Sequence, residues 1–427
     1  MGLSANSRSD TRQFSVLAVA LLWAILLLSL APGAKGEAAP RPNVDEDPGG
    51  APYVAGKLLV LYEPGTSENT EQAVVRGSGG QTAKDLPGEI RLISFPGIRR
   101  EESEEARTRS LERKLGNLRN EPRVEAADYN FIRRASWVPN DPKFGGQWGL
   151  DKARFPRAWN DAKGRNVKIA IVDSGIDKGH PDIAKIAAQR NFFTGSAVVN
   201  DGNGHGTHVA GIAAALTNND RGVAGGCPRC ELLVAKVMKA SGLVKDSNLV
   251  PAIDWSVDQG ADVINLSFGG AQRSTVLKDA IDRAYADGKG AVVVAAVGNA
   301  GTSMRPSTRQ YPAAYKDAIA VSATNSDDKP ASFSSRGDWV DLAAPGAGIL
   351  STRAAIEGGG YGDESGTSEA APFVSALAGL LASEGKTAGE IRERMQSTAA
   401  DLGPAGDDPY YGHGRIDANT AVNTAVP

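Results

Sequence analysis

Short apolar runs alternate with longer amphipathic segments over the last two thirds of the chain. The apolar runs have the length of β-strands and occupy residues 167–172, 232–237, 263–266, 291–297 and 318–322. The segments with helical spacing occupy residues 207–216, 247–259 and 274–287. Continuous apolar strands separated by helices predict an α/β fold, with a doubly wound and mostly parallel sheet covered by helices on both faces. Functional groups of such sheets collect at the carboxyl ends of the strands.

A smaller pattern precedes this region. Strand-like segments lie at residues 57–62, 89–95 and 124–131, and the charged segment 101–118 carries Leu111, Leu115 and Leu118 at helical spacing. These elements predict a small α+β unit over residues 53–135, ahead of a main domain over residues 136–427. Residues 37–52 are rich in Pro, Gly and Asp and are interpreted as a linker.

The N-terminus has the pattern of an export signal. Residues 14–31 form an almost unbroken apolar run that follows Arg8 and Arg12, and small residues at positions 34 and 36 suit a signal peptidase. We therefore expect residues 1–36 to be a signal peptide and the mature protein to be secreted and extracellular, with no membrane association. The run is slightly long for a signal peptide, so an uncleaved anchor is the alternative.

Composition adds little beyond this picture. The chain has 427 residues, which is more than one compact domain usually needs, and 41% apolar with 23% charged residues is ordinary for a globular protein. The net charge of −3 gives no reason to expect a nucleic acid or an anionic membrane as partner.

The only two cysteines, Cys227 and Cys230, lie in one Cys-Pro-Arg-Cys segment. A zinc ribbon would need a second such pair, and no thioredoxin-like unit is readable around this one. In an oxidising compartment the pair is best interpreted as a short structural disulfide, with two reduced thiols as the alternative.

Three residues are positioned for nucleophilic catalysis. Ser368 follows a Gly-containing turn and precedes the apolar helical segment 373–382, so backbone N–H groups would point at charge that develops near its hydroxyl. Asp173 ends a predicted strand, and His205 opens a predicted helix. A carboxylate, an imidazole and a hydroxyl can therefore meet at one edge of the sheet, where the carboxylate orients the imidazole and the imidazole accepts the serine proton.

Three phrases carry a specific resemblance. Asp-Ser-Gly-Ile-Asp at 173–177, Gly-His-Gly-Thr-His-Val-Ala-Gly at 204–211 and Gly-Thr-Ser at 366–368 resemble the signature blocks of the subtilisin family. Their order, Asp then His then Ser, matches that family and not the α/β-hydrolases. Over residues 136–427 the likeness is to thermitase-type subtilases.

The resemblance implies a role for each of these residues. Asp173 would orient His205, His205 would be the general base, and Ser368 would be the nucleophile of an acyl-enzyme. Asn299 would donate its side-chain amide to the oxyanion together with the Ser368 N–H, although an Asn in a loop often only forms a turn.

The resemblance also implies how the protein is made and what it does. It implies a secreted serine endopeptidase that degrades protein or peptide substrates with broad specificity and acts as a monomer. Residues 53–135 would be a propeptide that assists folding and inhibits the enzyme, with self-cleavage near Ala135-Ser136. An inactive or weak binding protein of the same fold is one alternative, although the triad and Asn299 are complete. A narrow-specificity processing protease is the other.

Substrate and calcium sites are implied by the same likeness. The residues expected to contact substrate are Gly242, Leu243 and Val244, which would pair with substrate backbone, and Ser267, Phe268, Gly269, Ala296 and Gln310, which would wall the specificity pocket. A structural Ca²⁺ would be held by oxygen atoms of Asp141, Asp182, Leu216, Asn219, Arg221 and Val223. A plain polar loop at residues 216–223 is the alternative.

Two departures from the family pattern flank the nucleophile. Glu369 stands where the family usually has Met, and Phe373 stands where it usually has His. A carboxylate beside the oxyanion opposes negative charge there, and it also replaces an oxidisable side chain. We therefore predict reduced turnover and good tolerance of peroxide.

Overall fold

The computed structural model describes residues 44–47, 52–98, 103–132, 137–286, 290–301 and 308–424. The chain divides into two compact units, residues 1–134 and residues 135–427. The predicted signal peptide and the predicted cleavage site at Ala135-Ser136 lie outside the described residues. Among the helices in the described part of the chain, none has the length and apolar character that crossing a bilayer requires.

The smaller unit is an antiparallel sheet with two helices. Its strands are β1 (Val44–Glu46), β2 (Pro52–Tyr62), β3 (Gln81–Leu86), β4 (Ile90–Ser94) and β5 (Val124–Phe131), and its helices are α2 (Glu68–Gly77) and α3 (Glu104–Arg119). The order is β1-β2-β4-β3, and β5 also pairs with β2. Leu111, Leu115 and Leu118 of α3 are buried, as their helical spacing predicts.

Two features of this unit differ from the sequence-based expectation. The segment 37–52, interpreted as a linker, contributes β1, which pairs with the first residues of β2. The elements α2 and β3 were not predicted, because β3 is mostly exposed and α2 buries only Glu71 and Val75, so neither shows a strong apolar pattern.

The larger unit contains the predicted parallel sheet. Its seven strands are β6 (Lys168–Asp173), β7 (Ile186–Asn191), β8 (Glu231–Lys236), β9 (Val263–Leu266), β10 (Val292–Ala296), β11 (Ala318–Thr324) and β12 (Leu342–Pro345). They are arranged in the order β12-β11-β10-β9-β6-β8-β7, and every neighbouring pair is parallel. The α/β doubly wound prediction is confirmed.

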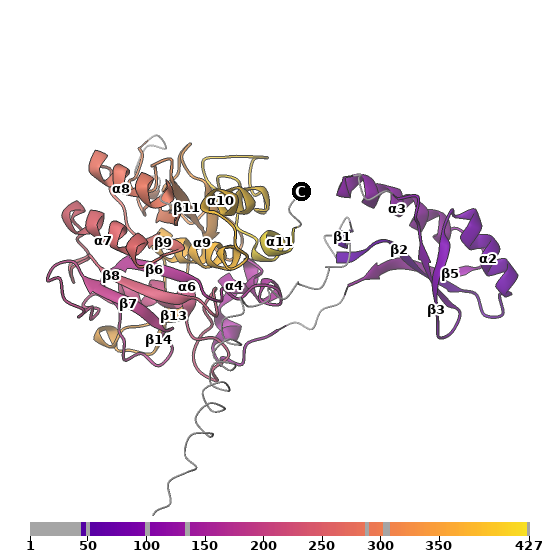
Figure 1. Ribbon diagram of the computed structural model, residues 1–427, viewed down its shortest axis with the longest axis horizontal. Helices are drawn as coiled ribbons and strands as arrows, with labels where there is room; N and C mark the ends of the chain where they lie inside the picture. Colours follow the sequence, from indigo (N-terminus) through magenta and orange to yellow (C-terminus); the bar gives the residue numbers. More distant parts are fainter. Residues whose placement is uncertain are drawn as a thin grey trace, which may run out of the picture. The chain divides into compact units, whose positions relative to one another are not determined.

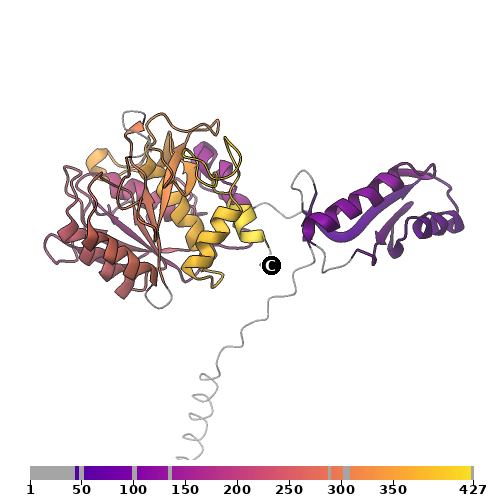
Figure 2. The same ribbon diagram turned by 90° about the horizontal axis from the view of Figure 1, so that it is seen from above.

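Helices cover both faces of this sheet. The packing helices are α6 (His205–Ala214), α9 (Thr367–Ala382) and α10 (Ala388–Ser397) on one face, and α7 (Asp246–Asp258) and α8 (Thr275–Ala286) on the other. Along β6, Ile169 and Ile171 enter the core with α9, whereas Ala170 and Val172 enter the core with α7 and α8. This alternation follows from the two-residue period of a strand and explains why β6 reads as one continuous apolar run. Figure 1 and Figure 2 show the two helical layers from two directions.

A two-stranded hairpin and several short helices complete the larger unit. The hairpin is formed by β13 (Ile349–Thr352) and β14 (Tyr361–Glu364), which pair antiparallel. The short helices are η1 (Phe144–Gly146), α4 (Trp148–Lys152), α5 (Phe155–Ala158), η3 (Ala355–Glu357) and α11 (Ala418–Asn423). Ser351 and Thr352 of β13 donate to the carbonyl oxygens of His208 and Thr207, at 2.8 and 2.7 Å, so the hairpin is fastened to α6.

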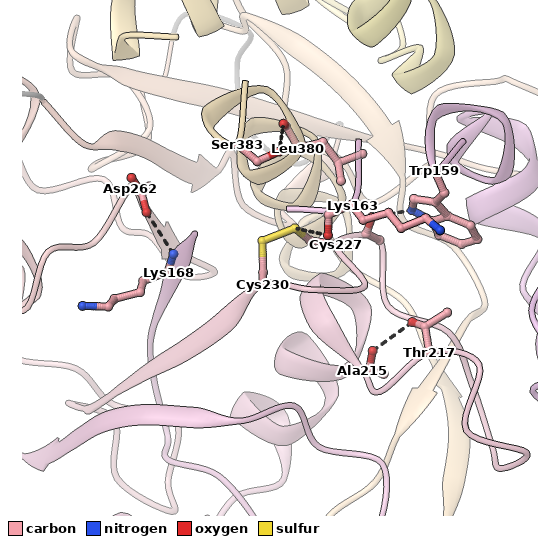
Figure 3. Close-up of a disulfide and its surroundings, with 11 residues drawn as sticks. Trp159, Lys163, Lys168, Ala215, Thr217, Cys227, Cys230, Asp262, Leu380 and Ser383 are labelled. Atoms are coloured by element: carbon pink, nitrogen blue, oxygen red, sulfur yellow. Dashed lines mark hydrogen bonds between the residues drawn. A yellow bond between two sulfur atoms is a disulfide. The ribbon is translucent and has the colours of Figure 1, made fainter. Parts of the chain in front are cut away.

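Cys227 and Cys230 form a disulfide in the turn that precedes β8 (Figure 3). The bond fits between two glycines, because a Cβ on Gly164 would lie 2.0 Å from the Cys227 sulfur and a Cβ on Gly379 of α9 would lie 2.9 Å from the Cys230 sulfur. Both cysteines are buried. The two sulfur atoms lie at bonding distance, in agreement with the sequence-based preference for a structural disulfide.

Candidate active site

Asp173 and His205 meet where β6 ends and α6 begins. Asp173 is the last residue of β6 and is fully buried, and His205 is the first residue of α6. His205 Nδ1 lies 2.8 Å from Asp173 Oδ1, and the Ser174 N–H donates to the same oxygen at 2.6 Å. Because an ionised carboxylate only accepts hydrogen bonds, Nδ1 carries the proton and Nε2 is the basic nitrogen of the neutral ring.

Glycines allow the helix to start this close to the strand. A Cβ on Gly206 would lie 2.2 Å from the carbonyl oxygen of Gly175 and 3.2 Å from the Cβ of Asp173. Gly204, which caps α6, has a φ of 104° that other residues rarely adopt. The Gly-His-Gly sequence is therefore required by the approach of α6 to β6.

Asp201 fixes the first turn of α6. Its carboxylate accepts hydrogen bonds from the N–H groups of Gly204 and Thr207 at 2.8 and 2.9 Å, from the Thr207 hydroxyl at 2.6 Å and from the Ser174 hydroxyl at 2.8 Å. Burial alone would raise the pKa of Asp201, but these hydrogen bonds outweigh burial and hold the pKa below its usual value. A single carboxylate in a loop gives no signal of this role in the sequence.

Ser368 lies in the first turn of α9, close to Asn299. A Cβ on Gly366 would lie 2.8 Å from Ser368 Oγ, 3.0 Å from Asn299 Nδ2 and 2.7 Å from Glu369 Oε2, so these three atoms surround Gly366. Asn299 Oδ1 accepts from the N–H and the hydroxyl of Thr367 at 2.8 and 2.9 Å. These two bonds fix the side-chain amide and leave its NH₂ group to donate elsewhere.

The Ser368 hydroxyl donates to Glu369 Oε2 at 3.2 Å, and in the described part of the chain no hydrogen bond joins it to His205. Burial raises the pKa of Glu369 to about 7. Burial opposes protonation of His205, but the Asp173 carboxylate, with Glu369 and Glu364, outweighs it and raises the pKa of His205. Glu369 therefore contacts the Ser368 hydroxyl and also favours the protonated form of His205.

The other histidines have structural partners. His208 is fully buried and its Nε2 donates to the Gly362 carbonyl at 3.1 Å. His180 Nε2 lies 2.7 Å from the Gly360 carbonyl, and its ring packs edge-on against Tyr361. His413 is exposed.

Most residues predicted to wall the specificity pocket lie at the carboxyl ends of β9 and β10. Ser267 Oγ donates to the Ser368 carbonyl at 2.9 Å, which ties this segment to α9. A Cβ on Gly269 would lie 3.6 Å from the Ala296 carbonyl, and buried Gln310 packs beside Gly298. Phe268 packs against the core on the α7 and α8 face.

Gly242, Leu243 and Val244 do not form the predicted edge strand. Only Val244 is paired, in a single antiparallel bridge with Met238, and Leu243 is 67% exposed. Gly242 has a φ of 77°, which turns the chain and interrupts the extended conformation that a strand needs. The segment is an exposed turn with one bridge.

The loop 216–223 encloses two buried carboxylates. The N–H groups of Asn218 and Asn219 donate to Asp141 at 2.8 and 3.3 Å. Asp182 accepts from Asn219 Nδ2 at 2.7 Å and from the Val223 N–H at 2.9 Å. Of the other two predicted ligands, Leu216 donates its N–H to the Asp182 carbonyl at 2.9 Å, and Arg221 donates its N–H to Asn219 Oδ1 within the loop at 2.9 Å.

The charges of this loop are unbalanced. Within the described residues, neither Asp141 nor Asp182 forms an ion pair with a Lys or Arg. Burial raises the pKa of Asp141, the adjacent negative charge of Asp182 adds to the rise, and burial and Asp182 raise the pKa of Tyr361 to about 12. Asn219 turns its amide nitrogen to Asp182, contrary to the predicted oxygen, but the two orientations of an amide are nearly isosteric. A bound cation would neutralise the carboxylates and favour the other orientation.

Comparisons with known proteins agree on one family. The model of the subtilase family matches residues 164–414. Thermitase from Thermoactinomyces vulgaris is 44% identical over 288 residues, which cover 67% of this chain and 99% of that protein. A thermophilic serine proteinase from Bacillus sp. (strain AK1) is 39% identical over 383 residues, which cover 89% and 90% of the two chains. A solved protease from Pseudoalteromonas arctica PAMC 21717 superposes with a TM-score of 0.60 at 29% identity, over 67% of this chain and 99% of that chain.

Proposed function

This chain belongs to the subtilase family and is a serine endopeptidase, and we propose that it cleaves peptide bonds through an acyl-enzyme on Ser368. The hydrogen bond between Asp173 and His205 carries the proposal, because it fixes the basic nitrogen of the ring. The convergence of Ser368 Oγ and Asn299 Nδ2 on Gly366 supports it.

The proposed reaction uses these groups in two stages. His205 Nε2 takes the hydroxyl proton as Ser368 Oγ attacks the carbonyl carbon of the substrate, and the carbonyl oxygen becomes an oxyanion. Asn299 Nδ2 and the Ser368 N–H donate to that oxyanion. His205 then gives its proton to the leaving amine, and a water molecule releases the acyl group by the same steps.

A labelling experiment tests the roles of the triad. A serine-directed acylating inhibitor should modify Ser368 and abolish hydrolysis of an unfolded protein substrate. The variants Ser368→Ala and Asp173→Asn should each show neither labelling by the inhibitor nor hydrolysis of the substrate. Ser365→Ala is the matched control, because Ser365 is an exposed residue of the same loop whose hydroxyl accepts a hydrogen bond from the Gly348 N–H at 2.8 Å. Labelling that persists in Ser368→Ala would contradict the proposal.

We infer that the chain is a secreted, self-processing precursor whose residues 53–135 act as propeptide and inhibitor. The separate fold of the smaller unit supports this inference, as does the alignment with the Bacillus proteinase, which extends over more residues than the larger unit contains. Ser368→Ala, made in a protease-free host, should accumulate as an unprocessed precursor on a gel. A mature-sized product from that variant would rule out self-processing.

We further propose broad specificity for protein substrates. The residues predicted to wall the pocket, Ser267, Phe268, Gly269, Ala296 and Gln310, are all uncharged, so none of them selects a charged substrate side chain. Cleavage-site sequencing on a denatured protein tests this proposal, since a single preferred residue before the cut would favour the narrow processing enzyme.

A calcium ion would fit the loop at 216–223. Asp141 and Asp182 would supply carboxylate oxygens, Asn219 its amide oxygen after reorientation, and Leu216, Arg221 and Val223 their carbonyl oxygens. The ion would neutralise two buried charges and cross-link the loop to residues 141 and 182, which stabilises the fold and takes no part in the reaction.

A further inference from the structure

Three side chains of the larger unit form a compact cluster that the proposed reaction does not use as a whole. His208 comes from α6, Glu364 from β14 and Glu369 from α9. One nitrogen or oxygen atom from each lies within 4.8 Å of the other two. His208 and Glu369 are buried, whereas Glu364 is partly exposed, so Glu364 is the member of the cluster that meets solvent.

Two buried atoms in this cluster lack a hydrogen-bond partner. His208 Nε2 donates to the Gly362 carbonyl, so Nδ1 of the neutral ring presents a lone pair. This atom lies 3.8 Å from Glu369 Oε1, and both atoms are without a partner in the described part of the chain. The Ile349 backbone also faces the ring but does not reach hydrogen-bond geometry at Nδ1. Two buried acceptors that face each other are unfavourable unless something positive lies between them.

The separation fits a metal ion better than a proton. A hydrogen bond between N and O needs about 2.7–3.2 Å, which is shorter than the observed distance. Zinc binds imidazole nitrogen and carboxylate oxygen at about 2.0–2.2 Å, so two such bonds span up to about 4 Å. The hydrogen bond from Nε2 to a backbone carbonyl is also the usual partner of a metal-binding histidine, because it fixes the ring and the tautomer.

We propose that His208, Glu364 and Glu369 bind a divalent transition metal ion of the zinc class and that this ion switches off the nucleophile. One imidazole and two carboxylates suit zinc or cobalt, and water would complete a four-coordinate site. The site is distinct from the oxygen-only set around Asp141 and Asp182, which suits calcium.

The geometry explains why the bound ion would inhibit. The Ser368 hydroxyl donates to Glu369 Oε2, so an ion on Oε1 would hold the carboxylate ionised and keep that hydroxyl turned away from His205. The ion would also neutralise Glu364 and Glu369, two carboxylates that favour the protonated ring of His205 needed in the transition state. Inhibition rests on the proposed roles of Ser368 and His205, whereas binding of the ion does not.

The test measures binding and activity on the same enzyme. The purified protein is kept in excess calcium chloride, so that the oxygen site is filled, and is titrated with zinc chloride in equilibrium dialysis and in a peptide hydrolysis assay. We expect one zinc ion per chain and loss of hydrolysis over the same zinc concentrations. Cobalt chloride should give the intense visible absorption of four-coordinate cobalt.

Variants distinguish a direct bond between a carboxylate and the zinc ion from the general attraction of zinc to negative charge. Glu364→Gln and Glu369→Met each remove one ligand and should weaken zinc binding at least about 10-fold. Glu357→Gln is the control, because Glu357 lies against Gly204 and interacts with Glu364 and His205 but is outside the cluster. Its effect on zinc binding should stay within about 3-fold.

The outcomes distinguish the metal site from the proposed catalysis. Absence of stoichiometric zinc, or equal zinc affinity in all three variants and the parent, would overturn the site. Bound zinc with full hydrolysis would overturn the switch and leave the proposed function intact. A protein that binds one zinc ion but never hydrolyses peptides would overturn the proposed function and retain the site.

Discussion

The substitution Gly206→Ala tests how closely α6 must approach β6. The added Cβ would lie 2.2 Å from the Gly175 carbonyl oxygen, and ordinary van der Waals contact begins at 3.4 Å. The contact is with backbone, so no side chain can rotate away. The start of α6, which carries His205, has to move by about 1 Å relative to the strand that carries Asp173.

The expected loss follows from that displacement. A misplacement of about 1 Å in a catalytic group costs about 10²-fold in rate, so we expect kcat to fall about 100-fold. KM should change little, because the displaced groups act in the transition state. Overpacking of this kind also costs about 1–3 kcal/mol of stability.

The assay separates a displaced triad from a misfolded chain. Active-site titration counts the molecules that acylate, peptide hydrolysis gives kcat and KM, and a thermal melt measures stability. Gly145→Ala is the control, because Gly145 lies in η1 with nothing within 4 Å of an added Cβ. A Gly206→Ala enzyme with parental kcat and melting temperature would refute the reasoning, since α6 would then not depend on this contact.

Four further results are expected. Asn299→Ala should lower kcat by about 10²–10³ with little change in KM, as measured by steady-state kinetics. This range comes from the corresponding donor in a subtilisin and not from this structure. Because carboxylates raise the pKa of His205 and only its neutral form is basic, kcat/KM should increase with pH through an acid limb above the ordinary histidine value of 6.5. A pH profile with its acid limb at or below that value would contradict this assignment. Glu369→Met should turn over faster but lose activity in peroxide sooner than the parent, as measured by residual hydrolysis after exposure. Chelation of calcium should lower the melting temperature, because the buried carboxylates of Asp141 and Asp182 then lose the cation that neutralises them. At a free calcium concentration of a thousand times the Kd, binding stabilises the folded protein by about 4 kcal/mol. An unchanged melting temperature after chelation would show that the loop does not bind calcium.

Much of the larger unit follows from its sequence because each central strand is buried on both faces. The runs that form β6, β8, β9, β10 and β11 are mostly apolar and almost entirely buried, so they are recognisable in the sequence. The edge strand β7 is only partly buried and shows no such run. The short strand β12 has the sequence Leu-Ala-Ala-Pro, which lacks the β-branched and aromatic residues that are enriched in strands, so its sequence does not distinguish it from a loop.

The candidate site divides in the same way. Asp173, His205 and Ser368 lie in distinctive phrases, and the sequence indicated all three. Thr367 and Asp201, which orient Asn299 and α6, act through hydrogen bonds between segments that are distant in the chain or irregular in form. The contact between Ser368 and Glu369 depends on a side-chain rotamer, which a sequence does not specify.

The carboxylate of Asp201 has a practical consequence for environments poor in divalent ions. It holds the start of α6 by accepting hydrogen bonds from the backbone N–H groups of Gly204 and Thr207 and from the Thr207 hydroxyl. The loop at 216–223 lies beyond the other end of that helix. In soft water the enzyme should therefore lose thermal stability well before His205 loses its position in the active site. At low temperature this loss of stability would not be visible in the activity.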